Sequence, residues 1–519
     1  MAKPFDFGEV KIDVQSGAGG PAPRPEPETP FRIALLGDFS GRANRGIREI
    51  GLSLANRRAV QIDRDNFGQV FAKFAPQIEL PIGEGGVTLT LAFRDLDDFH
   101  PDRLLERSEM FSKLREVRSR LQNPATFAAA AAELGVSASA RAAAPRDEAP
   151  RAVPPSVSRL ASGSLLEDMI EQTEARAPEV RRSRAPDELQ EFVRRVAEPH
   201  LVAAADPRQS QVLSLIDRAL SAQMSALLHV PDFQQLEAAW RAAYLLVRRI
   251  ESDSLLRLYL IDVSKDELAG DTSLSRDLRA SGLYRMLVEK TVGTPGAETW
   301  ALIAGNYTFG ESREDIELLG RLAKIASAAG APFLAAGSPR LLGCESLAKT
   351  PHPREWHPDR DVEAAAAWAA LRGLPEARSL GLVLPRFVLR LPYGKKTDPA
   401  ESFDFEEMSQ APAHEDYLWA NPAFGAALLL AQSFSDDGWD LRPGTHAEID
   451  GLPLHSFEMD GEAELMPCAE VLLTEEAAER IMESGLMPLV SIKGRDAARL
   501  VRFQSVAEPL RALAGRWTN

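Results

Sequence analysis

The sequence predicts an α/β protein, with mixed sheets flanked by helices, in a multi-domain chain that begins with an extended strand. Two observations support this fold class. In the second half of the chain, short apolar runs alternate with amphipathic runs, as in LRLYLIDV, WALIAG, DIELLGRLAKIASAAG and PFLAAG, and this alternation is typical of a sheet covered by helices. The length of 519 residues also exceeds what one hydrophobic core usually holds, which indicates roughly two to four domains.

The extended strand is predicted near the start of the chain, at EVKIDVQ. Val10, Ile12 and Val14 alternate with Lys11 and Asp13, which is the period of a strand with one apolar face. The Gly- and Pro-rich run SGAGGPAPRPEPETP follows it and cannot fold back as a tight hairpin. The strand therefore needs a sheet edge elsewhere, and two acceptors remain open: a sheet of the same molecule and a sheet of a neighbouring molecule.

The next part predicts a compact domain that ends near Leu134. FRIALLGDF and VTLTLAF are predicted strands, and one continuous helix is predicted over RDLDDFHPDRLLERSEMFSKLREVRSRL. The buried stripe of this helix is expected to consist of Phe111, Leu114, Val117 and Leu121. The composition then shifts to Ala, Pro, Arg and Ser, which indicates a linker. Two short amphipathic helices are predicted beyond it, at SGSLLEDMIEQTEA and DELQEFVRRVAEPHL.

The second half opens with two longer predicted helices. The apolar stripe of the first consists of Val212, Leu215, Ile216, Leu220, Met224 and Leu227. The second begins at a proline, and its stripe consists of Leu236, Trp240, Ala243, Tyr244 and Val247. Ser264 and Glu267 predict a capping box at a third helix. Further strands are predicted at LGLVLPRFVLRL and AEVLLT.

Charge and cysteine content limit the classes of partner and compartment. The chain has 60 Lys and Arg residues against 76 Asp and Glu, a net charge of −16, which argues against nucleic acid or an anionic membrane as the main partner. Its two cysteines, Cys344 and Cys468, have neither a disulfide framework nor a zinc-type spacing. The sequence shows no signal peptide and no apolar run long enough to cross a bilayer. We therefore expect a cytoplasmic protein.

The sequence predicts no catalytic, cofactor-binding or metal-binding residues, and no cofactor. It contains no GxxxxGK[ST] loop, and LLGDFSGR lacks both the spaced glycines of a dinucleotide motif and the GxSxG elbow, so a structural turn is favoured there. Asp95, Asp97 and Asp98 resemble a carboxylate cluster for a metal ion. They directly precede a helix, however, where acidic side chains satisfy free N–H groups, and this structural interpretation is favoured.

Other polar candidates also favour a structural interpretation. The run HPREWH contains two prolines and lacks the HExxH spacing, so a metal site at His352, Glu355 and His357 is not expected. Glu406 and Glu407 are interpreted as a solvated acidic pair, and His229 is interpreted as a capping or packing histidine. The tryptophans in apolar surroundings are expected in the core: Trp240, Trp419 and Trp439.

Two sets of motifs resemble known families. PFRIALLGDFSG, RRAVQIDRDNFGQVF, LTLAFRDLDDFHPDRLLER and KLREVRSRL occur in this order, and from about Val10 to Leu134 the chain resembles the small sheath subunit of type VI secretion systems, TssB or VipA. The second set is LLHVPDFQQLEAAWRAAYLLV, IAGNYTFG, APFLAAGSP, LVLPRFVLRLPYG, YLWANPAFGAALLL, SFSDDGW and EVLLTEEAAERIMESGLMPLV. From about Ser164 to Arg502 the chain resembles the large subunit, TssC or VipB.

The resemblance implies a sheath-subunit fold and a structural function, without enzymatic activity. In this family the small and large subunits interlock and stack into a helical tube around an inner needle tube, and extended strands reach into neighbouring units. The partners it implies are other copies or full-length sheath subunits, the inner needle-tube protein, a baseplate and an AAA+ ATPase that recycles the sheath. Nucleic acid and membrane insertion are not implied. The segment from Val10 to Val14 is the hypothesised inter-protomer strand.

The resemblance also divides the chain into four ranges. These are the N-terminal strand with its Gly/Pro linker (1–30), a TssB-like domain (31–135), an Ala/Pro-rich linker with short helices (136–205) and a TssC-like region (206–519). The family continues beyond the position that matches the end of this chain, so the TssC-like region is expected to be shortened at its C-terminus. The stretch that matches the ATPase-recognition helix, SLLEDMIEQTEA, is internal here. An alternative therefore stays open: a non-contracting cap, adaptor or regulator built from sheath domains.

Overall fold

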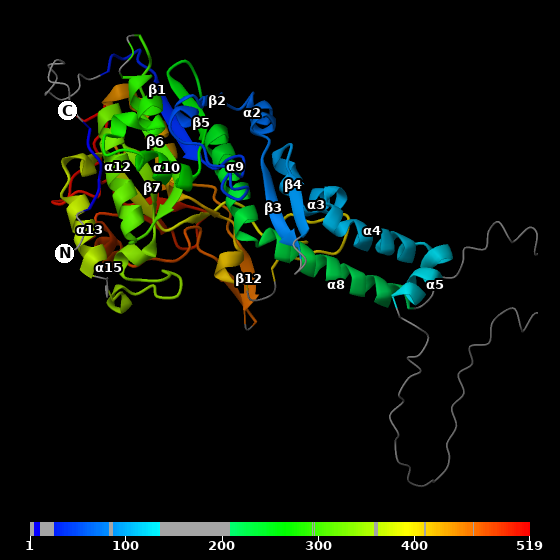
Figure 1. Cartoon of the computed structure of the whole chain (residues 1–519). Helices are drawn as coiled ribbons and strands as arrows, with labels where there is room; N and C mark the ends of the chain where they lie inside the picture. Colours follow the sequence, from blue (N-terminus) through cyan, green and yellow to red (C-terminus); the bar gives the residue numbers. More distant parts are fainter. Residues whose placement is uncertain are drawn as a thin grey trace, which may run out of the picture. The chain divides into compact units, whose positions relative to one another are not determined.

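The computed structural model describes residues 5–10, 25–82, 87–134, 208–292, 294, 296–357, 362–408, 412–459 and 461–518. The chain forms two compact units. The larger unit consists of Met1–Ser112 and Asp217–Asn519, and the smaller unit consists of Lys113–Ile216. The larger unit holds the main sheet and all the sites described below (Figure 1).

A mixed nine-stranded sheet forms the centre of the larger unit, with the order β11-β15-β14-β8-β7-β6-β1-β5-β2. The bounds of its strands are β1 Phe31–Gly37, β2 Val60–Ile62, β5 Leu256–Asp262, β6 Leu302–Phe309, β7 Phe333–Gly337, β8 Leu380–Leu384, β11 Glu448–Ile449, β14 Met487–Ser491 and β15 Ala498–Leu500. Neighbouring strands from β14 to β5 are parallel, whereas β2, β15 and β11 are antiparallel to their neighbours. The predicted α/β fold class is confirmed.

The first strand of the chain has an interior position in this sheet. β1 pairs with β5 from Phe31↔Leu256 to Gly37↔Asp262, and on its other side it pairs with β6. Most of its side chains, among them Ile33 and Leu35, are fully buried. The ranges predicted as TssB-like and TssC-like therefore contribute neighbouring strands to one sheet, while the four-range division itself stays a prediction.

Helices cover both faces of the sheet. On one face α12 (Arg313–Ala329), α13 (Val362–Arg372) and α15 (Glu475–Glu483) share a hydrophobic core with alternate strand residues, among them Leu36 and Leu382. On the other face α14 packs on β6 and β7 with almost its whole length buried, and α9 packs beside it. The bounds of these two helices are Pro422–Asp437 for α14 and Pro231–Arg249 for α9.

The remaining elements are short or lie outside the main sheet. The helices are α1 Leu52–Ala55, α2 Phe67–Phe74, α3 Pro101–Arg107, α4 Glu109–Gln122, α5 Pro124–Glu133, α8 Gln209–Leu228, α10 Lys265–Thr272 and α11 Gly282–Tyr284. Three two-stranded sheets are formed by β3 Gln77–Ile82 with β4 Val87–Ala92, β9 Phe387–Val388 with β10 Trp419–Ala420, and β12 Ser456–Met459 with β13 Glu462–Leu465.

Several local predictions are confirmed. FRIALLGDF, LRLYLIDV and PFLAAG contain β1, β5 and β7, and WALIAG covers the first half of β6. The capping box at α10 is present, because Ser264 Oγ accepts from the Glu267 N–H (3.2 Å) while the Glu267 carboxylate accepts from the Ser264 N–H (2.9 Å). The Trp240 indole is fully buried and packs among Phe39, Phe67 and Phe71. Trp419 and Trp439 are also buried.

Two predicted elements differ from the structure. The run AEVLLT forms no strand: Glu470 has a φ of 45°, which breaks extended pairing, and Thr474 caps α15 by accepting from the Ala477 N–H (3.1 Å). The single helix predicted before residue 122 is divided into a 3-10 turn, α3 and α4. The residue before Pro101 is extended, as expected before proline, and Ser108 is extended with its hydroxyl accepting from the Met110 N–H (3.3 Å).

The predicted apolar stripes are buried with a few exceptions. Leu215 on α8 is 51% exposed and Tyr244 on α9 is 36% exposed. Leu114 and Val117 on α4 are half-buried, whereas Phe111 and Leu121 are buried. The two short helices predicted at SGSLLEDMIEQTEA and DELQEFVRRVAEPHL lie outside the described residues.

Candidate functional site

The turn after β1 is held by two aspartates. The Asp38 carboxylate accepts from the N–H groups of Arg42 (2.6 Å) and Ala43 (2.8 Å). Asp262, at the end of β5, accepts from the Ser40 N–H (3.1 Å) and the Ser40 hydroxyl (2.7 Å). Burial raises the pKa of Asp262. These bonds show that LLGDFSGR forms a structural turn.

A buried carboxylate on α10 joins this turn to the TssC-like range. The guanidinium groups of Arg42 and Arg57 lie 3.1 Å and 2.9 Å from the carboxylate of Glu267, which is fully buried. Burial by itself would raise the pKa of Glu267, but the hydrogen bonds from Arg57, from two backbone N–H groups and from Arg42 hold it below its usual value. Glu49, half-exposed, contacts the same two guanidiniums at 2.6 Å and 2.9 Å.

A second acidic residue of α10, Asp271, also attaches the segment between β1 and β2 to this helix. Asp271, also on α10, is fully buried and accepts from the N–H groups of Gly51 (2.6 Å), Gly282 (3.0 Å) and Leu283 (2.8 Å). Gly282 has no room for a side chain, because a Cβ there would lie 2.2 Å from the Gly51 carbonyl oxygen. The segment between β1 and β2 is thus fixed to α10 and α11 by charge, hydrogen bonds and close packing.

A second buried ion network crosses the TssC-like range. Arg390 contacts Glu237 of α9 (2.8 Å) and Glu407 (2.7 Å), and Arg241 contacts the same Glu237 (2.6 Å). Arg241 also donates to the Tyr393 hydroxyl (2.9 Å). Burial by itself would lower the pKa of Arg390, but the two carboxylates raise it well above its usual value. The network links α9 to the segment that follows β9.

Glu407 is buried, and the interpretation of it as a solvated residue was therefore wrong. The sequence predicts a solvated acidic face for Glu406 and Glu407, but Glu407 is only 4% exposed, whereas Glu406 is exposed. Its carboxylate accepts from two guanidinium nitrogens of Arg390 and from the Tyr393 N–H (2.7 Å), and the His229 ring lies 3.6 Å away. The local sequence FDFEE does not predict this burial, because Arg390, the partner of Glu407, lies 17 positions earlier in the sequence.

The Glu407 network predicts a defined acid sensitivity. Burial would raise the pKa of Glu407, but Arg390, His229 and the Tyr393 N–H lower it from 4.5 to about 2. Because the folded pKa is depressed, this stabilisation is complete above pH 4.5 and is lost as the pH falls towards 2. Urea unfolding measured across that window should show a smaller loss of stability on acidification for Glu407→Gln than for the unmodified chain. Equal pH slopes in the two proteins would contradict the prediction.

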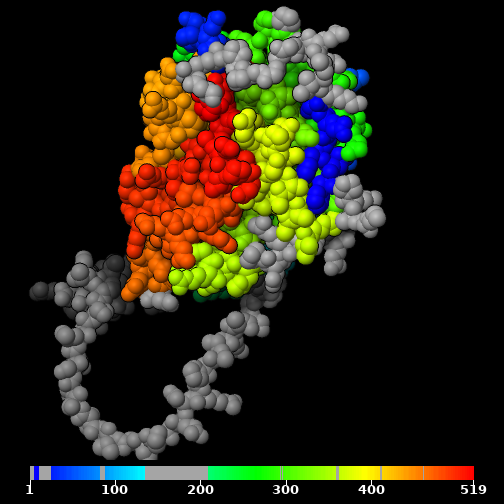
Figure 2. Space-filling model, turned by 90° about the vertical axis from the view of Figure 1, so that its left-hand side faces the viewer, coloured from blue at the N-terminus to red at the C-terminus, as the bar shows by residue number. Residues whose placement is uncertain are grey.

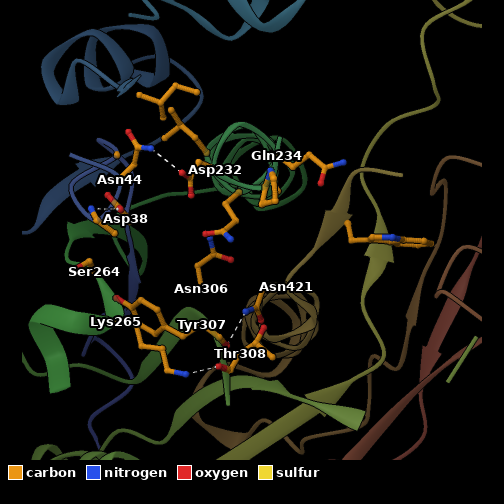
Figure 3. A pocket seen from close by; sticks show the side chains of 18 of the residues that line it. Asp38, Asn44, Asp232, Gln234, Ser264, Lys265, Asn306, Tyr307, Thr308 and Asn421 are labelled. Atoms are coloured by element: carbon orange, nitrogen blue, oxygen red, sulfur yellow. Dashed lines mark hydrogen bonds between the residues drawn. The ribbon is translucent and has the colours of Figure 1, made fainter. Parts of the chain in front are cut away.

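A cleft of about 720 Å³ opens at the carboxyl ends of β1, β5 and β6 (Figure 3). Its lining includes Asp38, Asp232, Lys265, Asn306 and Asn421. In open parallel sheets this edge is where ligands commonly bind. It is therefore the place where a catalytic arrangement would be expected first.

The polar groups of the cleft are engaged in structural bonds. Lys265 contacts Asp315 (2.5 Å) and donates to the Thr308 carbonyl (2.7 Å). Asn421 donates to the Tyr307 carbonyl (2.9 Å), and Asn44 donates to Asp232 (2.7 Å). The hydroxyl of Tyr417, another lining residue, is hydrogen-bonded to the His455 ring (2.7 Å), and burial raises the pKa of this hydroxyl. These interactions fix the side chains that line the cleft.

The hypothesised inter-protomer strand is described only at its first residue. Val10 is half-buried, while Lys11, Ile12, Asp13 and Val14 lie outside the described residues. The preceding residues lie along α12 (Figure 2). Glu9 forms an isolated parallel bridge with Asp277, in which its N–H donates to the Arg276 carbonyl (2.6 Å).

Residues 5–10 pack against α12 and form hydrogen bonds with its side chains. The Asp6 N–H donates to Glu317 (3.2 Å), and Lys324 donates to the Gly8 carbonyl (2.7 Å). The Arg313 guanidinium lies 4.9 Å from the centre of the Phe5 ring. Phe7 packs against α12 where the helix carries Gly320, and a Cβ at that glycine would lie 2.2 Å from the Phe7 ring. The chain is therefore anchored immediately before the hypothesised strand.

We expect Gly320→Leu to release residues 5–10 without unfolding the sheet. The new side chain occupies the position of the Phe7 ring, which then loses its packing on the helix. Hydrogen exchange of the amides of residues 5–10 should accelerate by about tenfold or more, with protection in β1 and β6 unchanged. Ser327→Leu, at an exposed position of the same helix, is the matched control. Unchanged exchange in residues 5–10 of Gly320→Leu would show that Phe7 does not anchor the segment.

The aspartates near residue 95, which resemble a metal-binding cluster in the sequence, have structural roles. Asp95 caps the 3-10 turn by accepting from the Asp98 N–H (3.1 Å), and Asp98 accepts from the Arg94 N–H (2.7 Å) and binds Arg107, as the capping interpretation predicts. Over the described ranges, no group of three or more His, Cys, Asp and Glu side chains is arranged to hold a metal ion. None of the described helices combines the length and apolar character that a membrane span requires.

Comparison with known families gives matches over the two ranges. The family model for VipB, described as a tail sheath N-terminal domain, matches residues 210–507. The family model for VipA of the type VI secretion system matches residues 10–134. The first match alone covers more than half of the chain.

Two relatives from Pseudomonas aeruginosa agree with these matches. The chain is 35% identical over 304 residues to the type VI secretion system sheath protein TssC1, covering 57% of this chain and 61% of the relative. It is 28% identical over 105 residues to the sheath protein TssB1, covering 19% of this chain and 59% of the relative. The chain thus spans about three fifths of the length of each relative. With these matches, it belongs to the type VI secretion sheath family and joins regions of the small and the large sheath subunit in one polypeptide.

Proposed function

We propose that the chain is a fused structural protomer of a type VI secretion contractile sheath. It assembles with copies of itself or with full-length sheath subunits into a helical tube around an inner needle tube. Its action is mechanical: repacking of the protomers in the tube shortens the sheath, and the chain itself catalyses no reaction. The further partners of this proposal are a baseplate and an AAA+ recycling ATPase, and its location is the cytoplasm.

The observation that carries the proposal is the position of β1. A strand of the VipA-matching range lies between β5 and β6 of the VipB-matching range, and the buried Glu267 and Asp271 hold the following turn in place. A protomer that transmits force needs its two parts to move as one body. Joining them in one chain also fixes their ratio at one to one and raises their effective concentration.

The proposal assigns the contact between protomers to the segment from Val10 to Val14. The anchored residues 5–10 precede it, and its alternating apolar pattern suits pairing with a sheet edge of a neighbour. Backbone pairing of this kind supplies affinity, while the apolar positions Val10, Ile12 and Val14 fix the register.

Negative-stain electron microscopy of the purified chain, with and without residues 9–15, tests this function. We expect long tubes or stacked rings from the full chain and discrete particles from the deletion variant. A triple substitution of Val10, Ile12 and Val14 by Asp should behave like the deletion, whereas Lys11→Ala with Asp13→Ala should still assemble. Discrete particles in every sample would contradict self-assembly and favour the cap, adaptor or regulator alternative.

A further inference from the structure

Residues 5–9 are attached to the outside of the larger unit, beside α12. Their two aromatic side chains are half-buried and pack against its hydrophobic core. The Glu9 N–H donates to the Arg276 carbonyl (2.6 Å), and the Glu9 carbonyl accepts from the Leu278 N–H (2.9 Å). Figure 2 shows the start of the chain, in blue, on the surface of the molecule. We call residues 5–9 the latch, and the residues that contact them the latch surface.

The second and fourth positions of the latch each suit one residue type. The Asp6 carboxylate lies near the guanidiniums of Arg276 (3.9 Å) and Arg321 (3.8 Å), and it accepts from the Gly8 N–H (3.1 Å). Gly8 has a φ of 67°, a conformation that favours glycine. A Cβ at Gly8 would also lie 2.8 Å from the Leu278 side chain. A larger residue at this position therefore cannot dock in the same way.

The first and third positions hold aromatic rings. The Phe7 ring fills the space that a side chain at Gly320 would need, and the Arg313 guanidinium lies 4.9 Å from the centre of the Phe5 ring. The latch surface thus selects an aromatic residue, Asp, a second aromatic residue and Gly, in this order. The run FDF also occurs at residues 403–405, but both of its rings are buried and have no access to this surface.

The latch is attached by contacts that remain partly open to water. The Asp6 side chain is 44% exposed, Glu9 is exposed, and of the five latch residues only Gly8 is buried. The latch also lies outside the nine-stranded sheet. Terminal segments with few buried contacts open at a free-energy cost far below that of global unfolding. The latch can therefore detach while the sheet stays folded.

We propose that the latch is releasable and that its surface recognises peptides of the pattern aromatic–Asp–aromatic–Gly. The docked latch fixes Val10, and the Trp439 indole fixes Thr29 by donating to its carbonyl (2.7 Å). With both ends fixed, no residue between them can lie farther than roughly 30 Å from the nearer end, whereas release lets Val10 move up to roughly 60 Å from Thr29. A partner segment of the same pattern displaces the latch and so extends the reach of the segment from Val10 to Val14.

Fluorescence anisotropy of a labelled peptide of residues 2–10 tests the latch directly. The receptor is the full chain with Phe5→Ala and Phe7→Ala, which weakens its own latch and leaves the latch surface unchanged. We expect saturable binding at least about tenfold tighter than binding to the unmodified chain, whose own latch competes at high effective concentration. Equal affinities for the two receptors, or no binding to the double variant, would overturn the proposal.

Variants of the peptide check the pattern. Gly8→Val and, separately, Asp6→Lys in the peptide should each weaken binding by at least about tenfold, whereas Glu9→Gln, at an exposed position, should stay within about twofold. Arg276→Glu in the receptor should recover part of the affinity for the Asp6→Lys peptide, because opposite charges meet again. Arg276 is 74% exposed, so this change leaves the fold intact. Equal binding of all the peptides would contradict recognition of the pattern.

A change on α12 locates the binding site. Gly320→Leu added to the receptor should abolish peptide binding, whereas Ser327→Leu, at an exposed position of the same helix, should leave it unchanged. Urea unfolding of both receptors checks that they are equally folded. Peptide binding that survives Gly320→Leu places the site elsewhere and overturns the proposal.

The role of the latch in setting the reach of Val10–Val14 rests on the proposed function, but peptide binding is measured without assembly. Binding without tubes or rings supports the latch and contradicts self-assembly into a sheath. Tubes without binding overturn the latch and leave the sheath function standing.

Discussion

Arg390→Met should lower the free energy of unfolding by about 3–5 kcal/mol, one of the largest effects of any single substitution in this chain. Arg390 is the shared cation of Glu237, which is fully buried, and Glu407, whose side chain is 1% exposed. Removing it leaves two carboxylates without their main counter-charge in a site closed to water, and the apolar replacement satisfies neither. Urea denaturation monitored by circular dichroism measures the change.

A surface pair provides the control for this prediction. Lys395 contacts Asp404 at 2.7 Å, and both side chains are about two-thirds exposed. Lys395→Met should change the stability by less than about 1 kcal/mol, since solvent screens exposed ion pairs. Equal effects of the two substitutions would show that the Arg390 network contributes no more than a surface pair.

Glu267→Gln should have the second large effect, about 3 kcal/mol of destabilisation, because it leaves Arg42 and Arg57 without their common buried anion. The glutamine keeps the size of the side chain and can still accept from the Ser264 N–H. The loss of stability therefore reflects mainly the missing negative charge. The consequence should be local: hydrogen exchange should accelerate first between β1 and β2, where the turn loses its attachment to α10.

Glu49→Gln is the matched control for Glu267→Gln. Glu49 contacts the same two guanidiniums, but its side chain is 50% exposed, so its loss should cost less than about 1 kcal/mol. A larger effect from Glu49 than from Glu267 would contradict the role of the buried carboxylate.

Much of the local structure was predictable because it depends on neighbours in sequence. The apolar runs of β5, β6 and β7 are long enough to stand out against their surroundings, and the capping box of Ser264 and Glu267 acts over three residues. The break of the long helix at Ser108 was missed, because a serine within an otherwise helical pattern gives only a weak signal.

The arrangement in space was less accessible from the sequence. β1 pairs with β5 and β6, strands more than 200 residues further along the chain, and a single apolar run does not reveal its partner. Glu237 and Arg390 form a buried pair across 153 positions, yet each has a sequence context that also suits a solvated charge. The family resemblance identifies the class of protein. The structure was needed to find the Glu267 network that joins the two ranges and the Arg390 network within the TssC-like range.

Producing the VipA-matching and VipB-matching ranges as separate chains tests most directly whether the two ranges fold as one body. Residues 1–135 and 206–519 would be produced in one cell as two chains, with an affinity tag on the first only. We expect them to purify together in a one-to-one ratio and to unfold in a single transition, because β1 completes the sheet between β5 and β6. Recovery of residues 206–519 alone, folded and with the stability of the intact protein, would contradict it.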